Sequence, residues 1–117
     1  MVKFVACVRR REGMSTEEFQ DYWRNNHGPL VASVPEFWQY VRKYVQGHTM
    51  TEPVPGFPPS DETAFDGIAE LWFDSAEDVG QAFSHPRYLE IIRPDEQKFV
   101  DFTASRIFLV KDVQITG

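Results

Sequence analysis

The sequence predicts an α+β fold in which an antiparallel sheet carries its helices on one face. Three observations support this fold class: the order of strand-like and helix-like segments, two clear helix starts, and a length of 117 residues, which suits one hydrophobic core. The segments follow the order β-α-β-β-α-β, which is that of a ferredoxin-like unit. We therefore expect a single ferredoxin-like domain over residues 1–117.

The first strand and the first helix have specific local signals. Residues 3–10 are mostly apolar, include two β-branched valines and end in charge, as a strand does. Ser15 and Glu18 have the spacing of a capping box, in which each side chain satisfies a free backbone N–H group of the first helical turn. An apolar stripe follows at 3–4 spacing, so we expect a helix over 15–27.

A glycine–proline pair at 28–29 is expected to end this helix, because the residue before proline avoids helical dihedral angles. The helix would then present the imidazole of His27 at its carboxyl end. Residues 30–38 are expected to add one or two helical turns after the proline.

The remaining elements are predicted from periodicity and helix starts. They are strands over 39–48, 66–73 and 105–114, a helix that begins after Ser75, and short helical continuations over 86–93 and 94–101. Residues 49–65 form one long irregular segment with four of the eight prolines. Loops of this length are lids, binding loops or disordered connections, so a lid, a dimer arm and disorder all remain open.

Both faces of the predicted central strands are apolar. In the first strand, Phe4, Ala6 and Val8 would share one face, and Val5 and Cys7 the other. The third strand likewise has apolar side chains on both faces. A sheet with one face in water should instead alternate between apolar and polar residues. We therefore expect a second copy of the chain to cover the free face, in a homodimer.

Composition excludes several classes of function. The net charge of −6 argues against nucleic acid as a partner. No apolar stretch approaches the length that crosses a membrane, and a single cysteine favours a reducing compartment, so a cytoplasmic protein is expected. The 10 Phe, 3 Trp and 4 Tyr residues exceed what a small core needs, which suggests a pocket or a subunit interface.

His27 is the first candidate catalytic residue. The sequence has no phosphate-binding glycine loop, no closely spaced metal-ligand pair and no nucleophile motif, which leaves acid–base chemistry without a metal or cofactor. At a helix end the dipole favours the protonated imidazole and burial opposes it, which would suit proton transfer near neutral pH. The alternative is that His27 caps the last carbonyl groups of its helix.

The second strand supplies the second candidate, His48. In a regular strand Tyr40, Arg42, Tyr44, Gln46 and His48 share one face, and such a polar and aromatic face suits a ligand wall. At ~3.3 Å per residue, Tyr44 and His48 would lie roughly 13 Å apart and act on different ends of one substrate. The alternative is an edge strand with solvated polar groups.

Glu70 lies between apolar residues of the third strand, and a buried carboxylate must be paired or hydrogen-bonded. A structural ion pair is favoured over a substrate-orienting acid. Its possible cationic partners on flanking strands are Lys3, Arg9, Arg42 and Lys43. Three further aromatic residues, Tyr22, Trp23 and Trp72, fit a hydrophobic core better than an aromatic cage, although contact with a substrate remains open.

Three segments together resemble the EthD family. They are residues 13–30 with the helix-end His27, residues 44–48 with the strand-end His48, and residues 66–73. This resemblance implies a ferredoxin-like chain of the dimeric α+β barrel superfamily. In the relatives that the second strand resembles, both histidines lie beside the substrate pocket, which implies catalytic roles for them here.

The resemblance also implies a cofactor-independent lyase, namely a dehydratase, decarboxylase or cyclase, that acts on a hydrophobic, oxygenated small molecule of aromatic or polyketide type. His27 would remove a proton next to a carbonyl group, and His48 or Tyr44 would stabilise the enolate or protonate the departing oxygen. The alternatives are a non-catalytic accessory or ligand-binding protein and a cofactor-free oxygenase or isomerase of aromatic catabolism. One isomerase relative is associated with a cysteine on a later strand, and the third strand here has none.

Overall fold

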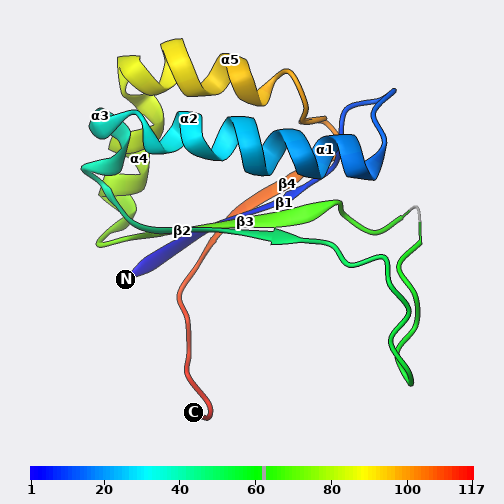
Figure 1. Ribbon diagram of the computed structural model, residues 1–117. Helices are drawn as coiled ribbons and strands as arrows, with labels where there is room; N and C mark the ends of the chain where they lie inside the picture. The colour runs from blue at the N-terminus through cyan, green and yellow to red at the C-terminus, as the bar shows by residue number, and fades with distance from the viewer. Residues whose placement is uncertain (62) are drawn as a thin grey trace.

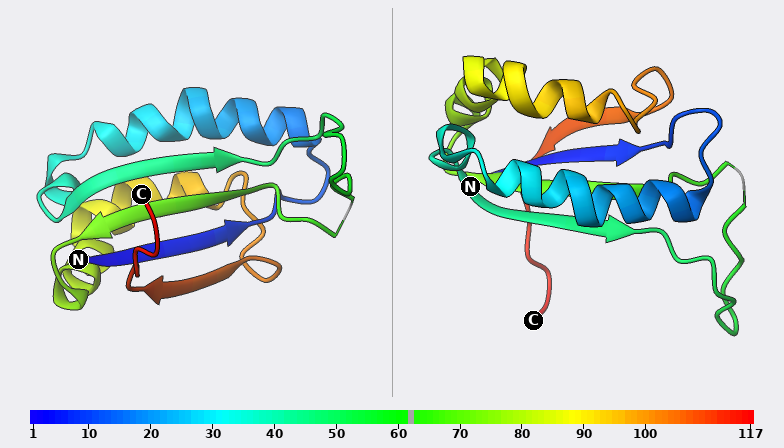
Figure 2. Two further views of the ribbon diagram at one scale, coloured as in Figure 1. Left: turned by 90° about the horizontal axis from the view of Figure 1, so that it is seen from below. Right: turned by 45° about the horizontal axis from the view of Figure 1, so that its top comes forward.

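A computed structural model describes residues 1–61 and 63–117. Four strands form one antiparallel sheet in the order β2-β3-β1-β4. The strands are β1 (Val2–Val8), β2 (Val41–His48), β3 (Gly67–Phe73) and β4 (Arg106–Val110). The helices follow β1 and β3 in the chain and lie together on one face of the sheet (Figures 1 and 2). The ferredoxin-like α+β fold predicted from the sequence is confirmed.

The register of the strands determines which side chains face the helices. Ala6 of β1 pairs with Ala69 on one side and with Ile107 on the other, and side chains alternate along each strand. The helix-facing side chains include Phe4, Ala6, Val8, Ala69, Leu71 and Ile107. The other side, here called the open face, carries Lys3, Val5, Cys7, Ile68, Glu70, Trp72 and Phe108. No helix of the described residues covers the open face (Figure 1).

The first helical segment is continuous (Figure 1). It consists of α1 (Thr16–Tyr22), the π-helix η1 (Trp23–His27) and α2 (Gly28–Ala32). The predicted capping box is present, because the Ser15 hydroxyl accepts from the Glu18 N–H group at 3.0 Å and the Glu18 carboxylate accepts from the Ser15 N–H group at 3.1 Å.

The predicted helix end at residues 28–29 is wrong. Gly28 has helical dihedral angles, φ −55° and ψ −54°, and its N–H group donates to the Trp23 carbonyl in a π turn. Gly28 has no Cβ to collide with the proline ring, and Pro29 lies in the first turn of α2, where its missing N–H group costs no hydrogen bond. His27 therefore lies inside a continuous helical segment rather than at its end.

The other elements follow the predicted order with shifted ends. They are α3 (Pro35–Trp38), α4 (Ala76–Ser84), the π-helix η2 (Tyr88–Ile92) and α5 (Arg93–Glu96). The Ser75 hydroxyl accepts from the Asp78 N–H group at 3.2 Å and so begins α4. The last strand is shorter than predicted, and residues 111–117 leave the sheet without helix or strand structure (Figure 1).

Two groups of buried side chains form the core between the sheet and the helices. One includes Phe37 and Phe73, and the other includes Phe19 and Phe99. Phe4 packs against both groups. The cavity described below is lined by members of both groups, so the two groups leave a space where they meet.

Residues 49–65 connect β2 to β3, and their described part has no helix or strand. Residue 62 lies outside the description. The segment extends past the sheet on the side away from the helices (Figures 1 and 2), with Phe57 72% exposed. A lid, a dimer arm and a disordered connection remain predictions for this segment. None of the helices in residues 1–61 and 63–117 is long and apolar enough to span a membrane.

Candidate active site

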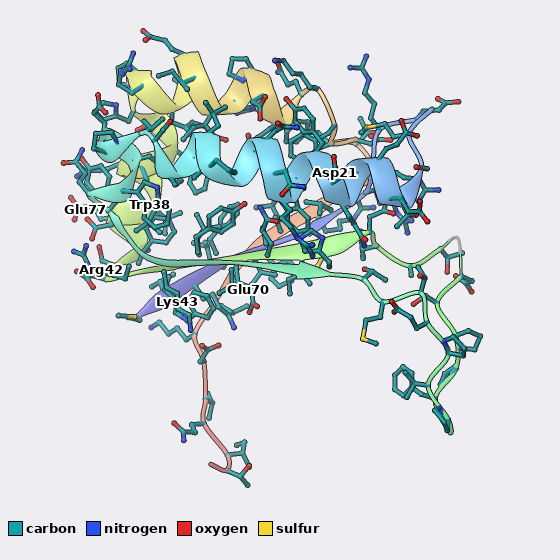
Figure 3. All side chains as sticks on the ribbon, viewed as in Figure 1. Asp21, Trp38, Arg42, Lys43, Glu70 and Glu77 are labelled. Atoms are coloured by element: carbon teal, nitrogen blue, oxygen red, sulfur yellow. The ribbon has the colours of Figure 1, made fainter. Side chains whose placement is uncertain are left out.

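An apolar cavity lies between the helix-facing side of the sheet and the helices. Side chains from the sheet and from the helices project into this layer (Figure 3). The cavity has a volume of about 360 Å³, within the range of about 300–1,000 Å³ that is typical of small-molecule sites. Most of its lining is aromatic or aliphatic and includes Phe4, Phe37, Phe83 and Phe99. Its polar and charged lining residues are His27, Tyr44, Tyr88, Arg93, Glu96 and Ser105.

His27 presents a proton acceptor at this cavity. The residue is only 4% exposed, and its Nδ1 lies 2.8 Å from Oδ2 of Asp95. Asp95 also accepts a hydrogen bond of 2.5 Å from the Tyr22 hydroxyl. A carboxylate beside Nδ1 keeps the ring proton on that nitrogen. Nε2 is left unprotonated, and it has no hydrogen-bond partner among the described residues.

The electrostatic environment keeps the imidazole neutral and its partner ionised. Burial lowers the pKa of His27, because the cationic ring loses its hydration, and the hydrogen bond and charge of Asp95 only partly oppose this. Burial raises the pKa of Asp95, but hydrogen bonds from Tyr22 and His27 outweigh that effect and leave its pKa below the ordinary value. A neutral imidazole beside an ionised carboxylate is the arrangement of a general base.

Gln46 on β2 hydrogen-bonds to η1 and to the hydroxyl of Tyr44, which is a second polar group of the cavity lining. Its Nε2 donates to the Trp23 carbonyl at 2.9 Å and to the Tyr44 hydroxyl oxygen at 3.0 Å. Gly28 permits this approach, because a Cβ there would lie 3.2 Å from the same nitrogen. Burial raises the pKa of Tyr44, so the phenol stays protonated. Its hydrogen has no acceptor among the described residues and can be donated to a ligand oxygen.

Tyr88 and Glu96 form another polar pair on the cavity wall. The Tyr88 hydroxyl donates to Oε1 of Glu96 at 2.6 Å. Tyr88 is the first residue of η2 and Glu96 is the last residue of α5. Their hydrogen bond therefore joins the two ends of one helical stretch beside the cavity.

In the described part of the chain, no group of three His, Cys, Asp or Glu side chains could hold a metal ion.

His48 is not among the residues that line this cavity, so the implied position of both histidines beside one substrate pocket stays a prediction. The His48 ring packs against Trp23 with centroids 4.7 Å apart, and Trp23 itself lines the cavity. The Nε2 atom of His48 lies 2.9 Å from the Gln46 side-chain oxygen, and its buried Nδ1 has no partner among the described residues. A catalytic role of His48 stays a prediction.

Two other predicted substrate contacts lie on the open face. Glu70 forms an ion pair of 3.0 Å with Lys3, which is the structural role that the sequence favoured. The Trp72 ring lies beneath two ammonium groups, Lys3 at 5.2 Å and Lys43 at 5.0 Å from its centroid. Figure 3 shows Lys43 and Glu70 on the side of the sheet away from the helices. Neither Glu70 nor Trp72 lines the cavity.

The predicted polar face of the second strand is shorter than expected. Tyr40 precedes β2, and its hydroxyl donates to Gln81 at the protein surface. Arg42 is exposed and pairs with Asp74 at 2.7 Å. The register of β2 shifts near its start, which breaks the alternation there. Of the five residues of the predicted face, Tyr44, Gln46 and His48 share the helix-facing side.

Sequence reasoning missed Asp95, Tyr88 and Glu96. Their segment carries only signals of an ordinary helix, because acidic residues after a first-turn proline complement the helix dipole. The hydrogen bond between His27 and Asp95 joins residues 68 positions apart. No motif marks such a pair, since the packing of one helical segment against the other creates it.

Replacing Gly67 with alanine is expected to lower the free energy of unfolding by about 1–3 kcal/mol, the cost of overpacking a core. A Cβ at this position would lie 2.5 Å from the Trp23 indole and 2.6 Å from the Gly47 carbonyl oxygen. Urea denaturation with an unchanged slope measures the loss. Gly80→Ala in α4 is the matched control, because nothing lies within 4 Å of its Cβ and it should gain up to about 1 kcal/mol. Equal destabilisation by both changes would contradict this packing.

Comparison with known proteins identifies relatives of the whole domain. Residues 11–103 match the EthD domain family. The conidial pigment biosynthesis dehydratase EthD of Metarhizium robertsii is 32% identical over 103 residues, which cover 82% of this chain and 71% of that protein. Dehydratase ustZ of Ustilaginoidea virens is 25% identical over 107 residues, which cover 86% and 75% of the two chains.

Solved structures share the fold. An EthD family protein from Bacillus halodurans has a TM-score of 0.66 at 18% identity, with 97% of this chain and 99% of that chain covered. A dimeric protein of unknown function with a ferredoxin-like fold, from Bacteroides fragilis, has a TM-score of 0.65 at 17% identity, with 95% of each chain covered. The match over residues 11–103 shows more than the fold, and the chain belongs to the EthD family.

Proposed function

We propose that the protein is a cofactor-independent dehydratase that removes water from a β-hydroxy ketone of aromatic or polyketide type. The observation that carries this proposal is His27, with Nδ1 bound to Asp95 and Nε2 available at an apolar cavity. The names of two relatives, both dehydratases, support the reaction class. The aromatic lining of the cavity supports a flat, hydrophobic substrate.

The proposed reaction begins with proton transfer. Nε2 of His27 takes a proton from the carbon next to the ketone, and the charge of Asp95 stabilises the imidazolium ion that forms. The Tyr44 hydroxyl donates to the ketone oxygen as negative charge develops on it. The enolate then expels the hydroxyl group from the neighbouring carbon, and a carbon–carbon double bond forms.

We also infer that two copies of the chain associate through the open face of the sheet. Ile68 is 37% exposed and Phe108 is 46% exposed on that face, and contiguous exposed apolar surface is typical of subunit interfaces. One structural neighbour is described as dimeric. The predicted homodimer is consistent with both observations.

The proposed function is tested with 3-hydroxy-1-tetralone, a bicyclic β-hydroxy ketone that becomes 1-naphthol when it loses water. The protein is expected to form 1-naphthol faster than the buffer alone, at the same rate under air and under argon. A rate that depends on dissolved oxygen would instead indicate an oxygenase. Saturable binding with neither 1-naphthol formation nor exchange of the C2 protons in D₂O would contradict the proposal and favour a binding protein.

Replacing Tyr44 with phenylalanine is expected to lower kcat by about 10²-fold, the usual loss of one hydrogen-bond donor to a developing oxyanion. The ring would still fill its place in the cavity lining. Steady-state kinetics with 3-hydroxy-1-tetralone measures kcat, and the affinity for 1-naphthol serves as the control because it depends on packing. An unchanged kcat would remove Tyr44 from the mechanism.

A further inference from the structure

Glu96 is an ionisable group of the cavity that the mechanism above does not use. The Tyr88 hydroxyl donates to Oε1 of Glu96 at 2.6 Å. The other carboxyl oxygen, Oε2, has no hydrogen-bond partner among the described residues, although the side chain lines the cavity. One oxygen is therefore fixed and the other is available to a ligand.

The helix geometry places Glu96 and the base at the same cavity. Asp95 and Glu96 are consecutive residues of α5, so their side chains point about 100° apart around the helix axis. Asp95 points to His27 on the neighbouring helical segment, and Glu96 reaches the cavity lining. Two adjacent residues thus supply the partner of the proposed base and a second ionisable group.

We propose that Glu96 is the general acid of the dehydration, an inference that rests on the proposed dehydratase function. His27 takes the proton from the carbon next to the ketone. The carbon–oxygen bond of the β-hydroxyl group then breaks, and the Oε2 proton of Glu96 transfers to the departing oxygen to form water. Glu96 ends as a carboxylate and His27 as an imidazolium ion, so the charges balance, and proton exchange with solvent restores both groups.

The surroundings of Glu96 suit this role. Burial raises the pKa of Glu96 to about 7, since the carboxylate loses its hydration. The Tyr88 hydrogen bond and the Arg93 charge lower the pKa, and Asp95 raises it. Tyr44 also lines the cavity, and the charge of Glu96 helps to raise the pKa of Tyr44. A large fraction of Glu96 is therefore protonated at neutral pH, when His27 is already neutral.

Glu96→Gln tests the inference, because glutamine keeps the shape of the side chain and has no acidic proton to transfer. With 3-hydroxy-1-tetralone in D₂O, the variant is expected to form 1-naphthol about 10²–10⁴-fold more slowly than the unchanged protein. Exchange of the C2 protons, which needs His27 and Tyr44 but not Glu96, should stay within a few-fold. The fall in kcat/KM above about pH 7 should disappear as well, since it reports deprotonation of Glu96. Glu90→Gln is the matched control, because Glu90 is exposed in η2.

The outcomes separate this inference from the proposed function. Normal 1-naphthol formation by Glu96→Gln, or equal loss of elimination and C2 exchange, would overturn the role of Glu96 alone. Absence of both reactions in the unchanged protein would instead overturn the dehydratase. Tyr88→Phe provides a second test that keeps the acid. It removes a hydrogen bond that lowers the pKa of Glu96, so the alkaline limb should move to higher pH, and an unmoved limb would contradict the assignment.

Discussion

Replacing His27 with alanine is expected to reduce kcat/KM for dehydration of 3-hydroxy-1-tetralone by about 10²–10⁴-fold, the usual contribution of a general base. His27 is the lining residue that combines a fixed tautomer with a free nitrogen at the cavity. Exchange of the substrate C2 protons in D₂O should fall by a similar factor, because both processes begin with the same proton transfer. Product formation and proton exchange are followed by absorbance and by NMR.

The pH dependence of kcat/KM in the unchanged protein gives an independent measure of the pKa of His27. The base acts in its neutral form, so kcat/KM should fall as pH falls through the pKa of His27. Burial lowers that pKa from 6.5, which places the acid limb below pH 6.5.

Two variants separate catalysis from folding. Alanine at position 27 leaves the buried Asp95 without its ring partner, whereas His27→Gln can still donate an N–H group to that carboxylate. Both variants should lose activity, and the glutamine variant should retain more stability. His85→Ala is the matched control, because His85 follows α4 and does not line the cavity. Wild-type proton exchange in His27→Gln would contradict the assignment of the base.

Local signals predicted the elements that local interactions determine. The Ser15 capping box was readable because both of its hydrogen bonds lie within four consecutive residues. The continuous apolar run of β1 predicted a central strand with two apolar faces, and the pairing of β1 with β3 and β4 confirms its central place.

Rules based on local sequence gave a wrong helix end where tertiary contacts and local geometry allow the helix to continue. The rule for residues before proline predicted a helix end at Gly28, but the π turn and the missing Cβ allow the helix to continue. The same glycine lets the Gln46 amide reach the Trp23 carbonyl. A residue on β2 thus satisfies a carbonyl of η1, which no periodicity in either segment could reveal.

The roles of Asp95 and Glu96 at the site could not be predicted from the sequence for a related reason. Asp95 and Glu96 follow Pro94 at the start of α5, where acidic residues need no functional explanation. Their significance arises from what faces them, namely His27 for the first and the cavity for the second. Trp23 packs against the His48 ring, a contact that alternation along the strand could not predict.

Replacing Asp95 with asparagine is expected to reduce kcat/KM by about 10²–10⁴-fold, although Asp95 does not line the cavity. The carboxylate holds the proton on Nδ1 of His27 and stabilises the imidazolium ion after proton transfer, the role of aspartate in a Ser-His-Asp triad. An amide can accept or donate at the same place, so it no longer selects the tautomer with a free Nε2. Tyr22 can keep its hydrogen bond to the amide, which should preserve the fold.

The pKa of His27 distinguishes this positioning role from a merely structural one. The hydrogen bond and charge of Asp95 both raise that pKa against the opposing effect of burial. Asp95→Asn should therefore lower it further, and the acid limb of kcat/KM should move to lower pH while the plateau falls. NMR titration of the His27 ring measures the shift directly. Asp21→Asn, an exposed change on α1, should leave both quantities unchanged.

Asp95→Asn makes His27 a weaker base, which explains why its pKa and the plateau of kcat/KM fall together. A lower pKa means that the neutral ring persists to lower pH, yet each proton transfer to it is less favourable, so the fraction of active enzyme rises while the rate constant falls. If Asp95 served only to fill space, asparagine would leave the titration of His27 and the plateau of kcat/KM where they are. A normal plateau with an unshifted pKa would therefore exclude the His27–Asp95 pair as the catalytic unit, even if His27 itself proved essential.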